Sequence, residues 1–171
     1  MSTHRYILTF ILLLSFYSCG SDKETIISNA ILSAQIKLSK GDCQGAIELL
    51  EAQGRQSSNA DYLKTLASGY ACRAGYSTAT LFGTDLPNVA SANLLSSFAG
   101  FSTSVEDQTV DIEDDDRFLD LQTAVDILLY AGGLRLTRNP TSALRAAEFS
   151  TIEAADIDTF LMFLLMAQLG K

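Results

Sequence analysis

The chain of 171 residues lacks tryptophan and contains only 2 prolines and 1 histidine. Few prolines favour helices, and the lack of tryptophan disfavours sites that stack against sugar rings. The one histidine, His4, lies in a segment that we expect to be removed. A mature chain without imidazole has no Ser-His or Cys-His nucleophile pair and no histidine-based zinc site. Ser-x-x-Lys pairs and glycine-rich phosphate loops are also missing, so we predict no catalytic, cofactor or metal site.

Basic residues are few as well. The chain has 12 Lys and Arg residues but 20 Asp and Glu residues, which gives a net charge of -8. Binding to nucleic acid requires a basic face, so nucleic acid is excluded as an expected partner. A hydrophobic fraction of 47% is ample for a core and argues against disorder. The length suits one domain.

The amino terminus has the pattern of an export signal. Residues 6–16 form a nearly continuous apolar run, which is shorter than the about 20 residues that span a bilayer but suits a signal peptide. The following Phe16-Tyr17-Ser18-Cys19-Gly20 resembles the bacterial lipobox, which implies a signal peptide at 1–18 and a lipid on Cys19. By resemblance to enterobacterial sorting, Gly20 implies an anchor in the outer membrane, with the protein facing the periplasm. An ordinary cleaved signal peptide with an incidental cysteine is the alternative.

Residues 29–75 predict three consecutive helices. Gly41-Asp42 ends the first helix and starts the second at Cys43, Gly54 ends the second, and Gly75 ends the third. Ser58 with Asp61 is a start signal of the capping-box type. Apolar residues recur at steps of three and four along each helix: Ile27, Ala30, Ile31, Ala34 and Leu38; then Ala46, Ile47 and Leu50; then Leu63, Leu66, Ala67, Tyr70 and Ala74.

This stretch resembles a known family. "KLSKGDCQGAIELLE" is similar to the middle of a tetratricopeptide repeat, and "LASGYACRAGY" is similar to the first helix of the next repeat. The resemblance covers about one and a half repeats. It implies that small residues at Ala34 and Ala46 let helices approach closely, while Leu66 and Tyr70 fill the gaps. We therefore predict an all-α fold of antiparallel helical hairpins over residues 19–104, either a short tetratricopeptide-like array or a helical bundle.

The chain has 3 cysteines, an odd number for an exported protein. Lipidation of Cys19 leaves the pair Cys43 and Cys72. Cys43 begins the second predicted helix and Cys72 ends the third, so an antiparallel pair of helices brings them together. We predict a disulfide between them, which an oxidising compartment permits. Two unpaired thiols that fill the core are the alternative.

The rest of the chain also reads as helical. Residues 77–88 predict a short helix and a turn, with Leu81 and Phe82 against the core, and 105–116 an acidic loop. Calcium is an alternative for the acidic cluster 111–116, although the spacing of a calcium loop is missing.

Residues 117–171 predict helices that pack on the same domain. Their signals are Arg135 and Arg138 at one helix end, Asn139-Pro140 at a helix start, Ser150 with Glu153 as a capping box, and a last helix that is apolar on every side over 160–167.

An all-round apolar helix is either buried centrally or covered by a partner, or the chain is part of a longer protein. The hypothesis that fits these features is a lipid-anchored protein of the cell envelope that binds another protein through a helical groove. It resembles the tetratricopeptide-bearing lipoproteins, which implies a role in secretion, envelope assembly or transport. The competing hypothesis is a carrier of a small apolar ligand, with a pocket lined by Phe98, Phe101, Phe160 and Phe163. An enzyme is not expected.

Overall fold

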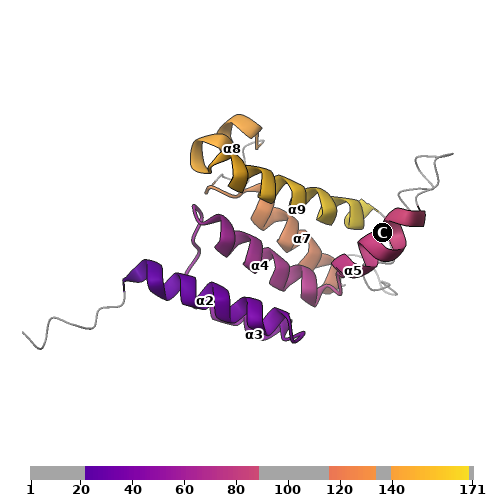
Figure 1. Ribbon diagram of the computed structural model, residues 1–171, viewed down its shortest axis with the longest axis horizontal. Helices are drawn as coiled ribbons and strands as arrows, with labels where there is room; N and C mark the ends of the chain where they lie inside the picture. Colours follow the sequence, from indigo (N-terminus) through magenta and orange to yellow (C-terminus); the bar gives the residue numbers. More distant parts are fainter. Residues whose placement is uncertain (1–21, 89–115, 134–139, 170–171) are drawn as a thin grey trace, which may run out of the picture.

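The fold is all-α throughout the residues that the computed structural model describes, which are 22–88, 116–133 and 140–169 (Figure 1). This confirms the predicted fold class for those residues. The elements are α2 (Lys23–Leu38), α3 (Cys43–Glu51), α4 (Ala60–Arg73), α5 (Thr78–Thr80), the π-helical turn η2 (Leu81–Asp85), the 3₁₀ turn η3 (Leu86–Asn88), α7 (Asp116–Leu129), α8 (Ser142–Glu148) and α9 (Thr151–Leu169).

The longer helices form two layers. In the first layer, α4 lies between α2 and α9 and contacts both. In the second layer, α3 packs against α2 and α4, and α7 packs against α4 and α9. Figure 1 shows α2, α4 and α9 stacked from the lower to the upper part of the view, with α7 behind α4 and α9. Each second-layer helix therefore lies against two consecutive first-layer helices.

The turn between α2 and α3 has the predicted chemistry. Gly41 has φ +76°, which suits glycine because it lacks a Cβ. The side chain of Asp42 accepts a hydrogen bond of 3.0 Å from the Gly45 N–H and therefore caps α3. Its carboxylate also pairs with Lys37 at 2.7 Å. These contacts lower the pKa of Asp42, first through Lys37 and then through the Gly45 N–H.

Two other helix starts differ from the prediction. Asn59, not Ser58, caps α4, because its side chain accepts a 2.8 Å hydrogen bond from the Tyr62 N–H. Thr141 caps α8 in the same way through the Leu144 N–H, so Pro140 precedes the cap instead of opening the helix. Neighbouring Ser, Thr and Asn residues are nearly equivalent as caps, so the sequence alone fixes these positions only to within one or two residues.

The predicted capping box of α9 is confirmed. The Glu153 carboxylate accepts hydrogen bonds from the Ser150 hydroxyl at 2.6 Å and from the Ser150 N–H at 2.9 Å. In return, Ser150 Oγ accepts from the Glu153 N–H at 3.3 Å. Hydrogen bonds from Ser150 hold the pKa of Glu153 below its ordinary value. The sequence thus identifies the start of this helix correctly.

The core lies between the two layers. Ala34 and Ala46 are fully buried, as the repeat-like pattern implies for positions of close approach. A Cβ added to Gly69 on α4 would lie 2.9 Å from Ile47 Cγ1 on α3, so only glycine permits this contact. Tyr70 is only half-buried, whereas Tyr62 is fully buried. The largest fully buried hydrophobic side chains are Tyr62, Leu50, Leu66, Leu81, Leu121, Leu128, Ile157 and Leu164.

The last helix is not buried on every side. One face of α9 is buried, with Ile157, Leu161, Leu164 and Ala167 in the core. On another face, Met162, Leu165 and Leu169 are 49%, 37% and 67% exposed. The expectation of a centrally buried helix is therefore wrong, and the expectation of a covering partner stays open.

The segment after α4 is more helical than predicted. Short helical turns follow one another from Thr78 to Asn88 without the expected open turn. Leu81 is fully buried, as predicted, but Phe82 is exposed, so its assignment to the core is wrong. Phe82 instead packs edge-on against Phe163 of α9, with the ring centroids 5.0 Å apart. In the described part of the chain, no helix has the length and apolar character to cross a membrane.

Candidate functional site

The predicted disulfide is present. Cys43 is the first residue of α3, Cys72 is the last but one of α4, and their Cα atoms are 5.6 Å apart. Helix ends at this distance permit a disulfide. The alternative of two unpaired thiols is therefore not what the structure shows. The bond fixes the start of α3 against the end of α4.

An ion pair beside the disulfide extends this connection to α7. Arg73 donates from Nε and Nη2 to the two carboxylate oxygens of Asp120, at 2.6 and 2.5 Å, and from Nη1 to Gln44 Oε1 at 2.5 Å. The hydrogen bonds to Asp120 raise the pKa of Arg73. Because Gln44 lies on α3 and Asp120 on α7, one guanidinium joins three helices. The sequence analysis did not identify this pair, because 47 residues separate its members.

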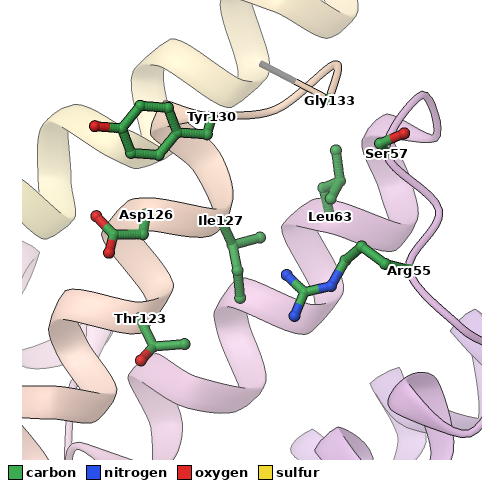
Figure 2. A pocket seen from close by; sticks show the side chains of 8 residues that line it. All are labelled: Arg55, Ser57, Leu63, Thr123, Asp126, Ile127, Tyr130 and Gly133. Atoms are coloured by element: carbon green, nitrogen blue, oxygen red, sulfur yellow. The ribbon is translucent and has the colours of Figure 1, made fainter. Parts of the chain in front are cut away.

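A groove lies between α4 and α7, and we call it the α4–α7 groove. It has a volume of about 330 Å³. The buried side chains of Leu63 and Ile127 form its floor. Figure 2 shows Ile127 between Asp126, on the α7 side, and Arg55, on the α4 side, with Leu63 above Arg55. The remaining lining residues are Ser57, Thr123, Tyr130 and Gly133.

Contacts along the rim hold the α4–α7 groove in shape. The Gly132 N–H donates to the Ser57 carbonyl at 2.9 Å, which joins the end of α7 to the loop before α4. Gly132 and Gly133 both have positive φ, so the chain turns there. Arg55 pairs with Glu51 at 2.8 Å, and Asp126 accepts from Gln122 Nε2 at 2.9 Å. The groove thus has an apolar floor and a fixed charge of each sign on opposite sides.

A second groove, the α4–α9 groove, has a volume of about 390 Å³ and contains half of the predicted carrier pocket. Phe160 and Phe163 line it, whereas Phe98 and Phe101 lie outside the described residues. Lys64 crosses it to pair with Asp156 at 3.2 Å. The other lining residues are Ser68 and Thr159. An ion pair beside the two phenylalanines makes this groove more polar than the predicted apolar pocket.

Other predicted sites lie outside the described residues. They include Cys19, the proposed lipidation site, and residues 111–115 of the acidic cluster. Asp116, the last acid of that cluster, is the first residue of α7 and suits the positive end of the helix dipole. In the described ranges, no three His, Cys, Asp or Glu side chains gather into a possible metal site.

Comparisons with known proteins add no relative. No protein-family model, curated protein or solved structure matches this chain.

Proposed function

We propose that this protein is a lipid-anchored scaffold of the cell envelope that binds a segment of another protein in the α4–α7 groove. The observation that carries the proposal is the composition of that groove. Two buried apolar side chains form its floor, and Arg55 and Asp126 lie on opposite sides of it. Grooves with an apolar floor are one of the recurring surfaces on which proteins bind segments of other proteins.

The two-layer order of the helices supports a tetratricopeptide-like array. In such an array the first helices of successive repeats neighbour one another, and the second helices lie between them. Here α2, α4 and α9 are consecutive neighbours in one layer, and α3 and α7 each pack against two of them. In this assignment α2 with α3 and α4 with α7 are two repeats, and α9 begins a third. Arrays of this kind function by binding other proteins on an extended surface.

The groove favours a particular kind of segment. An apolar side chain of the partner fits over Leu63 and Ile127. A carboxylate beside it pairs with Arg55, and an amide or cationic donor on the other side pairs with Asp126. Both groups already have a partner in their own chain, so they are held in place before binding. A short partner segment with opposite charges on either side of an apolar residue therefore matches the site.

Photocrosslinking tests this function in the cells that produce the protein. A photoreactive phenylalanine analogue at Tyr130 lies in the groove, and the same analogue at exposed Glu48 of α3 is the matched control. We expect one discrete protein adduct from position 130 and none from position 48. Asp126→Lys reverses one groove charge and should lower the yield of the adduct by about tenfold. Equal adducts from both positions, or none from position 130, would contradict the proposal.

The membrane anchor is the second part of the proposal. It rests on two observations: the segment Phe16–Gly20 resembles a lipobox, and Cys43 and Cys72 form a disulfide with each other. Cys19 is therefore left without a cysteine partner in the chain. With Gly20 after the cysteine, we propose the outer membrane and a periplasmic location. The intact mass of the mature protein under non-reducing conditions should show a chain that begins at Cys19, carries lipid and has lost two hydrogens. A mature chain that begins elsewhere and carries no lipid would reject the anchor. The carrier hypothesis stays a prediction.

A further inference from the structure

The last helix of the first layer has one side that no described helix covers. In the first layer, α4 has two second-layer neighbours, α3 and α7. By contrast, α9 has only α7 as a second-layer neighbour in the described part of the chain. On α4, α3 covers one side and α7 covers the other. On α9, α7 covers the first of these sides, and no described second-layer helix covers the second.

Residue positions show which side this is. On α4, the Tyr62 hydroxyl donates to the Leu50 carbonyl of α3, and the next residue, Leu63, lines the groove with α7. One residue along a helix is a rotation of about 100°, so the two neighbours of α4 are about that far apart. On α9, Gln168 Nε2 donates to Gln122 Oε1 of α7, and the next residue is Leu169. The side of α9 that corresponds to the α7 side of α4 is therefore the side of Leu169.

This side of α9 is apolar and exposed. Met162 and Leu165 follow the buried residues Leu161 and Leu164, and Leu169 follows the half-buried Gln168. The three side chains are 49%, 37% and 67% exposed. We call these three residues the α9 outer face. The acidic residues of α9 all lie in its first eight positions, and α9 contains no Lys or Arg. A helix that covers this face thus needs apolar residues along its length and positive charge beside the start of α9. The acids there are Glu153, Asp156 and Asp158.

The chain itself contains a helix with these properties at the opposite end of the stack. On α2, Leu32 and Ile36 lie one turn apart on the same side and are 58% and 48% exposed, and we call them the α2 outer face; Ile26, 44% exposed, lies about 100° away around the helix. Lys37 lies in the last turn of α2 and Lys40 just after it; Lys37 pairs with Asp42 in its own chain, and its side chain remains 40% exposed. With 16 residues, α2 is close in length to the 19 residues of α9.

We propose that the α2 outer face of one copy of this protein packs on the α9 outer face of another, with the two helices antiparallel. This orientation brings the lysine end of α2 beside the acidic start of α9, where the two helix dipoles also favour the approach. Asp156 and Asp158 pair with Lys64 and Arg145 in their own chain, yet their side chains remain 55% and 52% exposed, so both still accept a further cation.

The contact joins two different faces, so copies associate head to tail and the ends of a chain of copies stay open. One helix pair is a small area compared with the about 1,600 Å² of a standard interface, so we expect weak association that depends on concentration. The inference goes beyond the proposed function, and its failure would leave the α4–α7 groove unaffected, because neither outer face contributes to that groove.

Sedimentation of the mature protein in density-matched detergent tests the proposal. We expect the protein mass to rise with concentration for the unchanged chain. The double variants Met162→Glu/Leu169→Glu and Leu32→Glu/Ile36→Glu place charges in the two outer faces, and each should weaken self-association by about tenfold or more. Because each variant keeps one intact face, an equal mixture of the two should form a dimer and grow no further.

Controls separate this contact from other kinds of association. Ile152 is 76% exposed and lies on α9 about a quarter-turn away from Met162, so Ile152→Glu should self-associate like the unchanged chain. Lys40→Glu should weaken association several-fold, because it removes the charge match between the helix ends. Circular dichroism verifies that each variant is folded. We expect this result because the substituted side chains are exposed.

Three results would overturn the proposal: a monomer at every concentration, undiminished self-association of the α2 variant, or no dimer in the mixture. A monomer at every concentration would indicate that a helix of another protein covers the α9 outer face.

Discussion

Replacing both Cys43 and Cys72 by serine should lower the free energy of unfolding by about 3–4 kcal/mol. The bond closes a loop between residues that are 29 positions apart, and a loop of that length restricts the unfolded chain strongly. A domain of this size has a total stability of about 5–15 kcal/mol, so the loss is a large fraction of it. Urea unfolding of the two proteins, followed by circular dichroism, measures the difference.

A reductant provides the matched control for this prediction. It should lower the urea midpoint of the unchanged protein to that of the double serine variant, and it should leave the variant as it is. If the two proteins unfolded at the same urea concentration before reduction, the disulfide would contribute nothing and the prediction would be wrong.

Arg145→Ala should destabilise the protein by about 3 kcal/mol. Arg145 of α8 is 5% exposed, and its Nη2 donates to the carbonyls of Leu128 and Leu129 at 3.0 and 2.9 Å. Its Nη1 also pairs with Asp158 of α9. Burial lowers the pKa of Arg145, but an arginine stays charged in a protein. Without this side chain, the last turn of α7 loses its hydrogen-bond donor in a buried place.

The same urea experiment measures this effect, and two variants calibrate it. Arg55→Ala removes an exposed arginine that pairs with Glu51 four residues away, and it should change stability by no more than about 0.5 kcal/mol. Arg145→Lys keeps the charge but lacks the planar fork, so it should recover only part of the loss. A loss no larger for Arg145→Ala than for Arg55→Ala would show that α8 does not hold the end of α7.

The sequence predicted the features that depend on neighbouring residues. The turn at Gly41-Asp42, the helix that begins at Cys43 and the capping box of Ser150 with Glu153 are all local signals, and all are present. The disulfide was predictable as well, because the helix assignments placed one cysteine at the start of one helix and the other at the end of the next.

Features that depend on distant residues were not predictable in this way. The sequence assigned the positive charge at the end of α7 to Arg135 and Arg138, which lie outside the described residues. Arg145, from the next helix, donates a hydrogen bond to the end of α7, and the sequence analysis did not identify it. The α4–α7 groove likewise combines Leu63 with Ile127, which are far apart in sequence. The order of hydrophobic residues indicates that a helix has an apolar side, but it does not say which helix covers that side.

The link between Cys43 and Cys72 also affects how the protein responds to proteases. The turn between α3 and α4 exposes Gly54 and Arg55, so it offers a cleavage site between the two cysteines. A single cut there breaks the backbone, but the disulfide keeps both fragments covalently attached. The nicked protein would therefore retain its mass apart from one added water, and its two pieces would separate only after reduction.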